Sequence, residues 1–203
     1  MTKRRSSRRR VLDALRAVRP APTPLPELPP AGPPAGVAAF LDAAERAGAV
    51  AEVLAGGEAG LRARLAAYAP WVTARRVVSV VPGLPGAETP GGASDHPHTF
   101  ADVDVAVVRA EFGVAENGAL WFGAEDVPHR AVYLLAQHLI AVVPAEEIVA
   151  DLHAAYERIG SAEESVAAQS WRGFIAGPSK TADIEQALVI GAHGPRSLLI
   201  CLV

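Results

Sequence analysis

Apolar and polar residues follow one another along this chain in two patterns, one with the period of a helix and one typical of strands. Between residues 37 and 47, Phe40, Leu41 and Ala44 share one helical face, and Gly48 follows as a stop signal. The same reasoning predicts further helices at 60–68, 144–159 and 182–190. Short runs of apolar and β-branched residues predict strands at 49–54, 76–81, 131–135, 139–143, 174–176 and 197–203.

The segment 103–122 is also predicted to be mostly strand, and Asn117-Gly118 lies within it. Asn-Gly tolerates the positive φ of a type I′ turn, so this dipeptide predicts a β-hairpin. The strand at 197–203 is apolar after Ser197 and is preceded by a strand and a helix, which implies parallel strands that are covered on both faces. The predicted fold class is therefore α/β, with a mixed, mostly parallel, Rossmann-like sheet and helices on both faces.

Residues 1–36 differ from the rest of the chain. Residues 1–19 carry eight basic side chains and one acidic one, so their formal charge is +7. The whole chain has a formal charge of −3, so the remaining residues carry −10. Eight of the fifteen residues in 20–34 are prolines, which exclude helix and sheet and favour a stiff spacer. We therefore expect a basic, Pro-rich N-terminal extension over 1–36 and a folded α/β domain over 37–203.

Three interpretations of the basic end are open: a twin-arginine export signal, a nucleic-acid-binding arm and a short amphipathic helix. Asp13 and Arg16 interrupt any apolar core of an export signal, and no aromatic residues accompany the charges. Val11, Leu12 and Leu15 fall on one face of a helix, which favours the amphipathic helix. Nucleic acid is thus not the expected partner.

The composition excludes several classes of protein. The single cysteine, Cys201, excludes an internal disulfide framework and a cysteine-ligated iron–sulfur cluster in this chain. No apolar run approaches the roughly 20 residues that cross a bilayer, so we expect a cytoplasmic protein without a membrane segment. The dinucleotide fingerprint Gly-x-Gly-x-x-Gly and the nucleophile elbow Gly-x-Ser-x-Gly are both absent. These patterns predict no cofactor and no metal in this chain.

The strongest candidate site follows the predicted strand at 174–176 and precedes the predicted helix at 182–190. Its loop contains Gly177, Pro178, Ser179, Lys180 and Thr181. At such a position, unpaired backbone amides and the positive end of the helix dipole face a ligand. The hydroxyls of Ser179 and Thr181 and the Lys180 ammonium would hold a small carboxylate or phosphorylated ligand. A nucleoside-triphosphate loop is excluded because Ser179 stands where a glycine is needed.

Three further residues accompany this loop. Asp183 and Glu185 fall in the first turn of the predicted helix, and His193 follows its end. Acidic residues at the start and a histidine beyond the end also suit an ordinary capped helix, so that interpretation stays open beside the ligand site.

Glu116 is the second candidate, because it lies beside the Asn-Gly turn between apolar residues. It could serve as an ionised ligand or a nucleophile, or it could be an ordinary solvated turn residue. His96 and His98 carry metal-ligand atoms, but no second cluster completes a site.

The stretch from Gly177 to Glu185, the run at 191–195 and the terminal strand resemble the signature of the lactate utilization protein C (LUD-domain) family. Residues 115–118 resemble that family's alanine–glutamate–polar–glycine turn, with Asn117 where threonine or serine is more usual. The resemblance implies a fold akin to ribose-5-phosphate isomerase and the CoA transferases. It also implies a role in oxidising L-lactate to pyruvate beside partner proteins that carry iron–sulfur clusters.

A second resemblance supplies an alternative. Glu116-Asn117-Gly118 is similar to the Ser-Glu-Asn-Gly motif of family I CoA transferases, with Ala115 in place of the serine. That likeness implies a stand-alone transferase or isomerase that uses Glu116. For the first interpretation, we expect the ligand to lie between the Gly177 loop and the Glu116 turn. Glu116 and Asp183 would then orient it or transfer a proton.

Overall fold

The computed structural model describes residues 7–21, 23–24, 36–89, 96–123, 129–161, 171–183 and 186–203. The chain divides into two compact units, Met1–Pro30 and Ala31–Val203. In the first unit, helix α1 (Ser7–Ala17) confirms the predicted amphipathic helix. It buries no side chain, and Val11 and Leu15 are more than half exposed.

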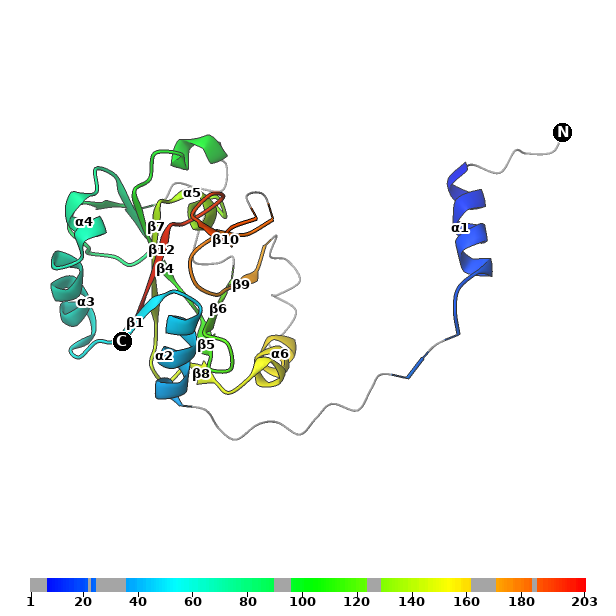
Figure 1. The fold of residues 1–203 in the computed structure, drawn as a ribbon, viewed down its shortest axis with the longest axis horizontal. Coiled ribbons are helices and arrows are strands. Elements are labelled where there is room, and N and C mark those ends of the chain that lie inside the picture. Colours follow the sequence, from blue (N-terminus) through cyan, green and yellow to red (C-terminus); the bar gives the residue numbers. More distant parts are fainter. Residues whose placement is uncertain are drawn as a thin grey trace. The chain divides into compact units, whose positions relative to one another are not determined.

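Within the described residues of the second unit, six strands form one wholly parallel sheet in the order β1-β12-β7-β4-β2-β3 (Figure 1). Their bounds are β1 Val50–Val53, β2 Val77–Ser79, β3 Ala87–Glu88, β4 Val105–Arg109, β7 His138–Val143 and β12 Ser197–Leu202. All strands of a parallel sheet start at one edge and end at the other. The sheet therefore has an amino edge and a carboxyl edge.

A second, mixed sheet has the order β8-β5-β6-β9. Its strands are β5 Phe112–Val114, β6 Ala119–Phe122, β8 Ile148–Val149 and β9 Gly173–Ile175. β5 pairs antiparallel with β6 and parallel with β8, and β6 pairs antiparallel with β9. β10 (Lys180–Thr181) and β11 (Val189–Ile190) form a small antiparallel pair.

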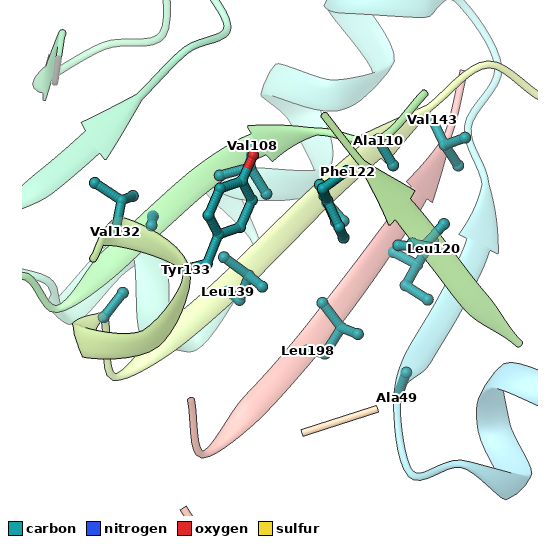
Figure 2. Close-up of a cluster of buried hydrophobic side chains, with 14 of the residues drawn as sticks. Ala49, Val108, Ala110, Leu120, Phe122, Val132, Tyr133, Leu139, Val143 and Leu198 are labelled. Carbon is teal, nitrogen blue, oxygen red and sulfur yellow. The ribbon is translucent and has the colours of Figure 1, made fainter. Parts of the chain in front are cut away.

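Successive side chains of β7 and β12 point to opposite faces of the parallel sheet, and both faces are covered. Helices α3 (Gly57–Ala66) and α4 (Ala69–Thr73) cover one face (Figure 1), where Leu61 and Leu65 pack against Ile140 and Leu199. Helix α2 (Val37–Arg46), helix α5 (Val132–Leu135) and the second sheet cover the other. Figure 2 shows Tyr133, Phe122 and Leu120 packed over the strands on that face.

The predicted α/β fold with a mostly parallel sheet is thus confirmed. The helix predicted at 37–47 and the strands predicted at 49–54, 76–81, 139–143 and 197–203 are present within a few residues. Helix α3 covers most of the helix predicted at 60–68. No helix of the described residues is long and apolar enough to cross a membrane.

Three local predictions are wrong. The strand predicted at 131–135 is the short helix α5. The helix predicted at 144–159 starts only at Leu152, as α6 (Leu152–Ser161), because Ile148 and Val149 pair with β5 as strand β8. The helix predicted at 182–190 is absent from its described residues, which end in β11 and include Gln186 with φ 54°. The strand preceding it, β9, belongs to the second sheet.

Candidate functional site

The loop that starts at Gly177 is shaped by close packing against α2. Gly177 has φ 69°, and a Cβ atom there would lie 2.0 Å from the carbonyl oxygen of Ala47. Only glycine combines this left-handed backbone with so close an approach. The chain then continues into β10, so the loop does not lead into a helix. The expected helix N-terminus, with its free amides and dipole, is therefore a wrong prediction.

Polar groups of this loop form hydrogen bonds with other parts of the protein. The Ser179 N–H donates to the carbonyl of Pro195 at 2.9 Å, and the Ser179 carbonyl accepts from the Gly191 N–H at 2.8 Å. The Lys180 ammonium donates to the carbonyl of Ala47, at the end of α2. A cation is favourable at this negative pole of a helix. Lys180 thus stabilises the end of α2 in this structure.

A cavity of about 260 Å³, here called the amino-edge pocket, lies beside this loop. It is lined by Tyr133, Leu134, Leu139, Ile175, Ala176, Gly177, Pro178, Ser179, His193, Gly194, Pro195 and Leu198. Leu139 and Leu198 are the second residues of β7 and β12, which places the pocket at the amino edge of the parallel sheet. Its walls are mostly apolar, and Ser179 and His193 supply polar side chains.

Four of the predicted ligand-binding residues line this pocket: Gly177, Pro178, Ser179 and His193. Lys180, Thr181 and Asp183 are close in sequence but are absent from its lining. Glu185 lies outside the described residues, so its predicted role stays a prediction.

Tyr133, which lines the amino-edge pocket, packs against two further aromatic rings. The Tyr133 side chain is 1% exposed, and its ring lies 5.1 Å from the Phe122 ring and 4.8 Å from the Trp171 ring, measured between centroids. Figure 2 shows the Tyr133 ring, which extends from α5 over the strands of the parallel sheet and lies beside Phe122. Contacts with Phe122 of β6 and with Trp171 therefore hold the Tyr133 ring in place beside the pocket.

The Glu116 turn is a hairpin loop between β5 and β6, as predicted, but of a different type. Four residues, 115–118, connect the paired positions Val114 and Ala119. Gly118 takes the left-handed backbone with φ 69°, whereas Asn117 does not, so the predicted type I′ turn is wrong. The Asn117 side chain instead accepts the Ala119 N–H at 3.0 Å.

The Glu116 carboxylate caps helix α6. Its Oε2 accepts the N–H of Leu152, the first residue of the helix, at 3.0 Å, and the Asp151 carboxylate accepts the Ala154 N–H at 2.9 Å. A carboxylate at this position accepts a hydrogen bond from an otherwise unpaired amide and interacts favourably with the positive pole of the helix dipole. This geometry gives Glu116 a structural role, and Glu116 is not among the residues that line the amino-edge pocket.

The two predicted motifs nevertheless lie side by side on α2. A Cβ on Gly118 would lie 2.4 Å from the nitrogen of Ala44, and one on Gly177 would meet Ala47. Positions 44 and 47 are about 4.5 Å apart along a helix axis. Helix α2 therefore brings together two turns that are 59 residues apart in sequence.

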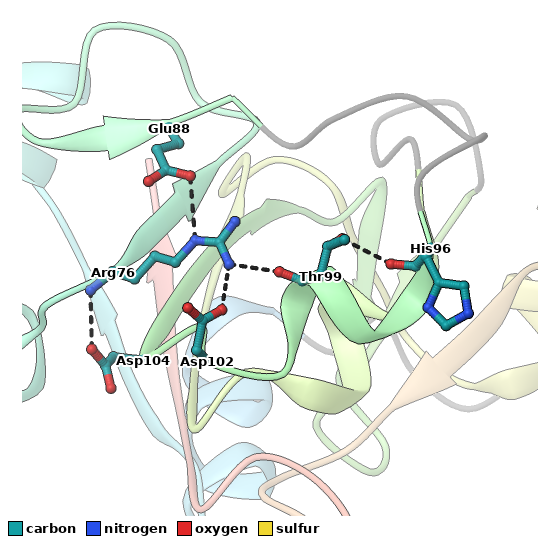
Figure 3. Close-up of polar contacts among 6 residues, drawn as sticks. All are labelled: Arg76, Glu88, His96, Thr99, Asp102 and Asp104. Atoms are coloured by element: carbon teal, nitrogen blue, oxygen red, sulfur yellow. Dashed lines mark hydrogen bonds and ion pairs between the residues drawn. The ribbon is translucent and has the colours of Figure 1, made fainter.

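The sequence did not reveal a polar cluster around Arg76, shown in Figure 3. The Arg76 guanidinium contacts the carboxylates of Asp102 and Glu88 and donates to the carbonyl of Thr99 at 2.6 Å. The Asp104 carboxylate accepts the backbone N–H groups of Arg76 and Arg75, which lower the pKa of Asp104. The partners are 12–29 residues apart, so no local pattern predicts a cluster that ties the start of β2 to the loop before β4.

A second hydrogen-bonded group also escaped prediction. His138 Nδ1 and the Ser197 hydroxyl lie 2.8 Å apart, and the Tyr68 hydroxyl lies 3.1 Å from that of Ser197. Burial lowers the pKa of His138, with a smaller contribution from Arg196. These side chains connect the starts of β7 and β12 to the helical layer of α3 and α4.

Residues 50–203 match the model of the LUD domain family. Lactate utilization protein C of Shouchella clausii is 35% identical over 92 residues, which are 45% of this chain and 40% of that protein. Lactate utilization protein C of Bacillus subtilis is 36% identical over 102 residues, or 49% of this chain and 42% of that protein. The match thus spans about two fifths of the length of these relatives.

The fold has a counterpart among solved structures. A crystal structure of a DUF162 family protein from Deinococcus radiodurans superposes with a TM-score of 0.54 and covers 82% of this chain and 95% of that one. The sequence identity is 22%, so this likeness concerns the fold alone.

Proposed function

Because the chain belongs to the LUD-domain family, we propose that it is a subunit of a lactate-utilization system and binds a small carboxylate in the amino-edge pocket. In this proposal, partner proteins with iron–sulfur clusters accept the electrons when L-lactate is oxidised to pyruvate. The names of the relatives in Shouchella clausii and Bacillus subtilis support the pathway. The observation that carries the ligand class is the cavity beside Ser179 and His193.

The lining of the pocket favours a carboxylate over a phosphorylated ligand. A buried charge needs hydrogen bonds or an opposite charge to offset its lost hydration. The Ser179 hydroxyl and the His193 ring can donate to one carboxylate, whereas no lysine or arginine is found among the described residues of the lining. The apolar walls suit a short carbon skeleton. A 2-hydroxy acid or its keto acid has this combination of one acid group and a small apolar end.

The residues of this chain do not fit an iron–sulfur cluster. A cluster takes several thiolate ligands, and this chain has one cysteine, Cys201. Cys201 is fully buried in β12, and burial raises its pKa to about 12, so it stays a thiol. The proposal therefore places the clusters in the partner proteins, which would accept the pair of electrons removed from lactate.

The alternative, a stand-alone CoA transferase or isomerase, would use Glu116 as a nucleophile. In this structure the Glu116 carboxylate accepts the Leu152 N–H, so an acyl adduct would remove the cap of α6. Glu116 also stands apart from the pocket lining. Both observations favour the lactate-utilization role over the transferase.

Growth on L-lactate as the sole carbon source tests the proposal. A strain that lacks this gene is complemented with the wild type, Ser179→Val, His193→Gln or the control His98→Gln, an exposed histidine outside the pocket. We expect the wild type and the control to restore growth and both pocket variants to restore it poorly, with unchanged thermal melting. Normal growth of the deletion strain, with no second copy of the gene present, would contradict the proposal.

A further inference from the structure

We propose that a second pocket, at the opposite edge of the parallel sheet, binds a small hydroxylated oxyanion, either a carboxylate or a phosphate ester, through Arg109 and Arg158. This carboxyl-edge pocket has a volume of about 340 Å³. It is lined where β4, β7 and β12 end, by Arg109, Val142 and Val203, and by Arg158 of α6. It is a different site from the amino-edge pocket and does not depend on the proposed function.

The two pockets are separated by the length of the strands. Leu198 of β12 lines the amino-edge pocket and Val203, just beyond the same strand, lines the carboxyl-edge pocket. Five steps along a parallel strand span roughly 16 Å. One small molecule cannot occupy both pockets, so a ligand at Arg109 is a second ligand.

Arg109 supplies a cation without a partner in the protein. It is the last residue of β4 and is exposed, and within the described part of the chain its guanidinium makes no hydrogen bond or ion pair. The adjacent strand ends anchor its backbone in the sheet, since Val105–Arg109 pairs with β7 along its whole length. The guanidinium is therefore available to an oxyanion, and the backbone that carries it is fixed in the sheet.

Arg158 is held in place on the other side of the pocket. Its guanidinium lies 2.5 Å from a Glu147 carboxylate oxygen and 4.7 Å above the centre of the Phe112 ring. The Glu147 carbonyl in turn accepts the Gly113 N–H at 2.9 Å, which ties this residue to β5. Contacts on both sides limit the movement of Arg158, so less entropy is lost when it binds a ligand.

The side chains around the pocket define the class of ligand. An arginine fork matches the paired oxygens of a carboxylate or a phosphate group. Glu111 and Glu147 also line the pocket, and carboxylates accept hydrogen bonds from hydroxyl groups. In addition, ligands of open α/β sheets gather at the carboxyl ends of the strands. A small anion that carries hydroxyl groups fits this set of donors and acceptors.

Calorimetric titration of the full chain with glycerol 3-phosphate and, separately, with L-lactate tests the inference and distinguishes the phosphate from the carboxylate. We expect saturable binding of at least one probe that Arg109→Gln weakens by about tenfold or more, the loss expected for a charged hydrogen-bonding partner. Arg75→Gln, which removes the same charge from an exposed arginine outside this pocket, should bind like the wild type.

Ser179→Val separates this inference from the proposed function. Binding at Arg109 should survive Ser179→Val, because that side chain lies at the other edge of the sheet. The inference is overturned if neither probe binds saturably, if Arg109→Gln binds like the wild type, or if only Ser179→Val weakens binding. The last result would leave the amino-edge pocket as the single site for the probe and would support the proposed function.

Discussion

The two edges of the parallel sheet carry pockets of opposite character. At the amino edge, loops and α5 enclose a mostly apolar cavity, and the nearby cation Lys180 is engaged by the carbonyl of Ala47. At the carboxyl edge, strand ends and α6 present two arginines and two glutamates. One wall of the amino-edge pocket, the loop that starts at Gly177, is therefore positioned by backbone packing against the end of α2. The character of the carboxyl-edge pocket depends on single charged side chains.

This contrast predicts that a backbone change at the amino edge has the largest effect. In Gly177→Ala the new Cβ would clash with the Ala47 carbonyl while the residue keeps φ 69°. Left-handed strain and overpacking together should lower the free energy of unfolding by about 3 kcal/mol. Urea denaturation measures this loss.

Gly86→Ala is the matched control for that variant. Gly86 has φ 74°, but a Cβ there would have no atom within 4 Å. It should lose only the cost of the left-handed backbone, about 1 kcal/mol. Equal losses in the two variants would show that packing of the loop on α2 does not shape the amino-edge pocket.

A smaller effect is expected from the cap that supports the carboxyl edge. Glu116→Ala removes the acceptor of the Leu152 N–H at the start of α6, the helix that carries Arg158. The loss should be about 1 kcal/mol, and Glu116→Gln should retain part of the cap. Faster hydrogen exchange of the Leu152 amide would report the same change.

Glu146→Ala provides the control, since Glu146 is an exposed acid between β7 and β8. If Glu116→Ala and Glu146→Ala have equal stability and equal exchange, the capping role assigned to Glu116 is wrong. A covalent acyl or CoA adduct on Glu116 would contradict it more strongly and would favour the transferase.

The amino edge should also respond to pH through His138. Burial lowers the pKa of His138 below its usual 6.5, with Arg196 adding to the effect and Asp104 opposing it. The unfolded chain then takes up a proton at a pH where the folded one does not, so stability is complete above about pH 6.5 and declines below it. The decline should be shallow, because the side chain is partly exposed.

Urea midpoints measured from neutral pH down to about pH 5 follow this decline. His138→Gln should flatten it, and His153→Gln, on α6, should leave it unchanged. A decline of the same size in His138→Gln would assign the pH dependence to other groups.

The smallest effect is expected for the reaction of a thiol reagent with Cys201, which lies in β12 between the two edges of the sheet. Cys201 is fully buried on the face of the sheet covered by α3 and α4, and its raised pKa of about 12 keeps the thiol protonated. A thiol reagent should therefore modify the folded protein negligibly and the urea-unfolded protein completely. Rapid modification of the folded protein would mean that solvent reaches the centre of the sheet.

Local signals in the sequence predicted much of the fold. The apolar stripe of Phe40 and Ala44 predicted α2, and the unbroken apolar run at 198–203 predicted a strand buried on both faces. The errors arose where distant pairing overrode local preference. Ile148 and Val149 lie in a helical pattern but pair with β5, and Lys180 and Thr181 pair with Ile190 and Val189.

The candidate site was predictable only in part, for the same reason. The loop that starts at Gly177 was identified and does border a cavity, but the direction of the Lys180 side chain depends on the end of α2, more than 130 residues earlier. Glu116 was identified by its turn, whereas its bond to Leu152 requires the position of α6. Arg109 had nothing but its charge to distinguish it, because three separate strand ends create its pocket.

Chemical-shift mapping of backbone amides during titration of the full chain with L-lactate tests whether the amino-edge pocket binds a small carboxylate. We expect saturable shifts at Ser179, His193 and Gly194, and their loss in His193→Gln. The amino-edge pocket is not the binding site if the signals of these three amides do not shift at high concentrations of L-lactate.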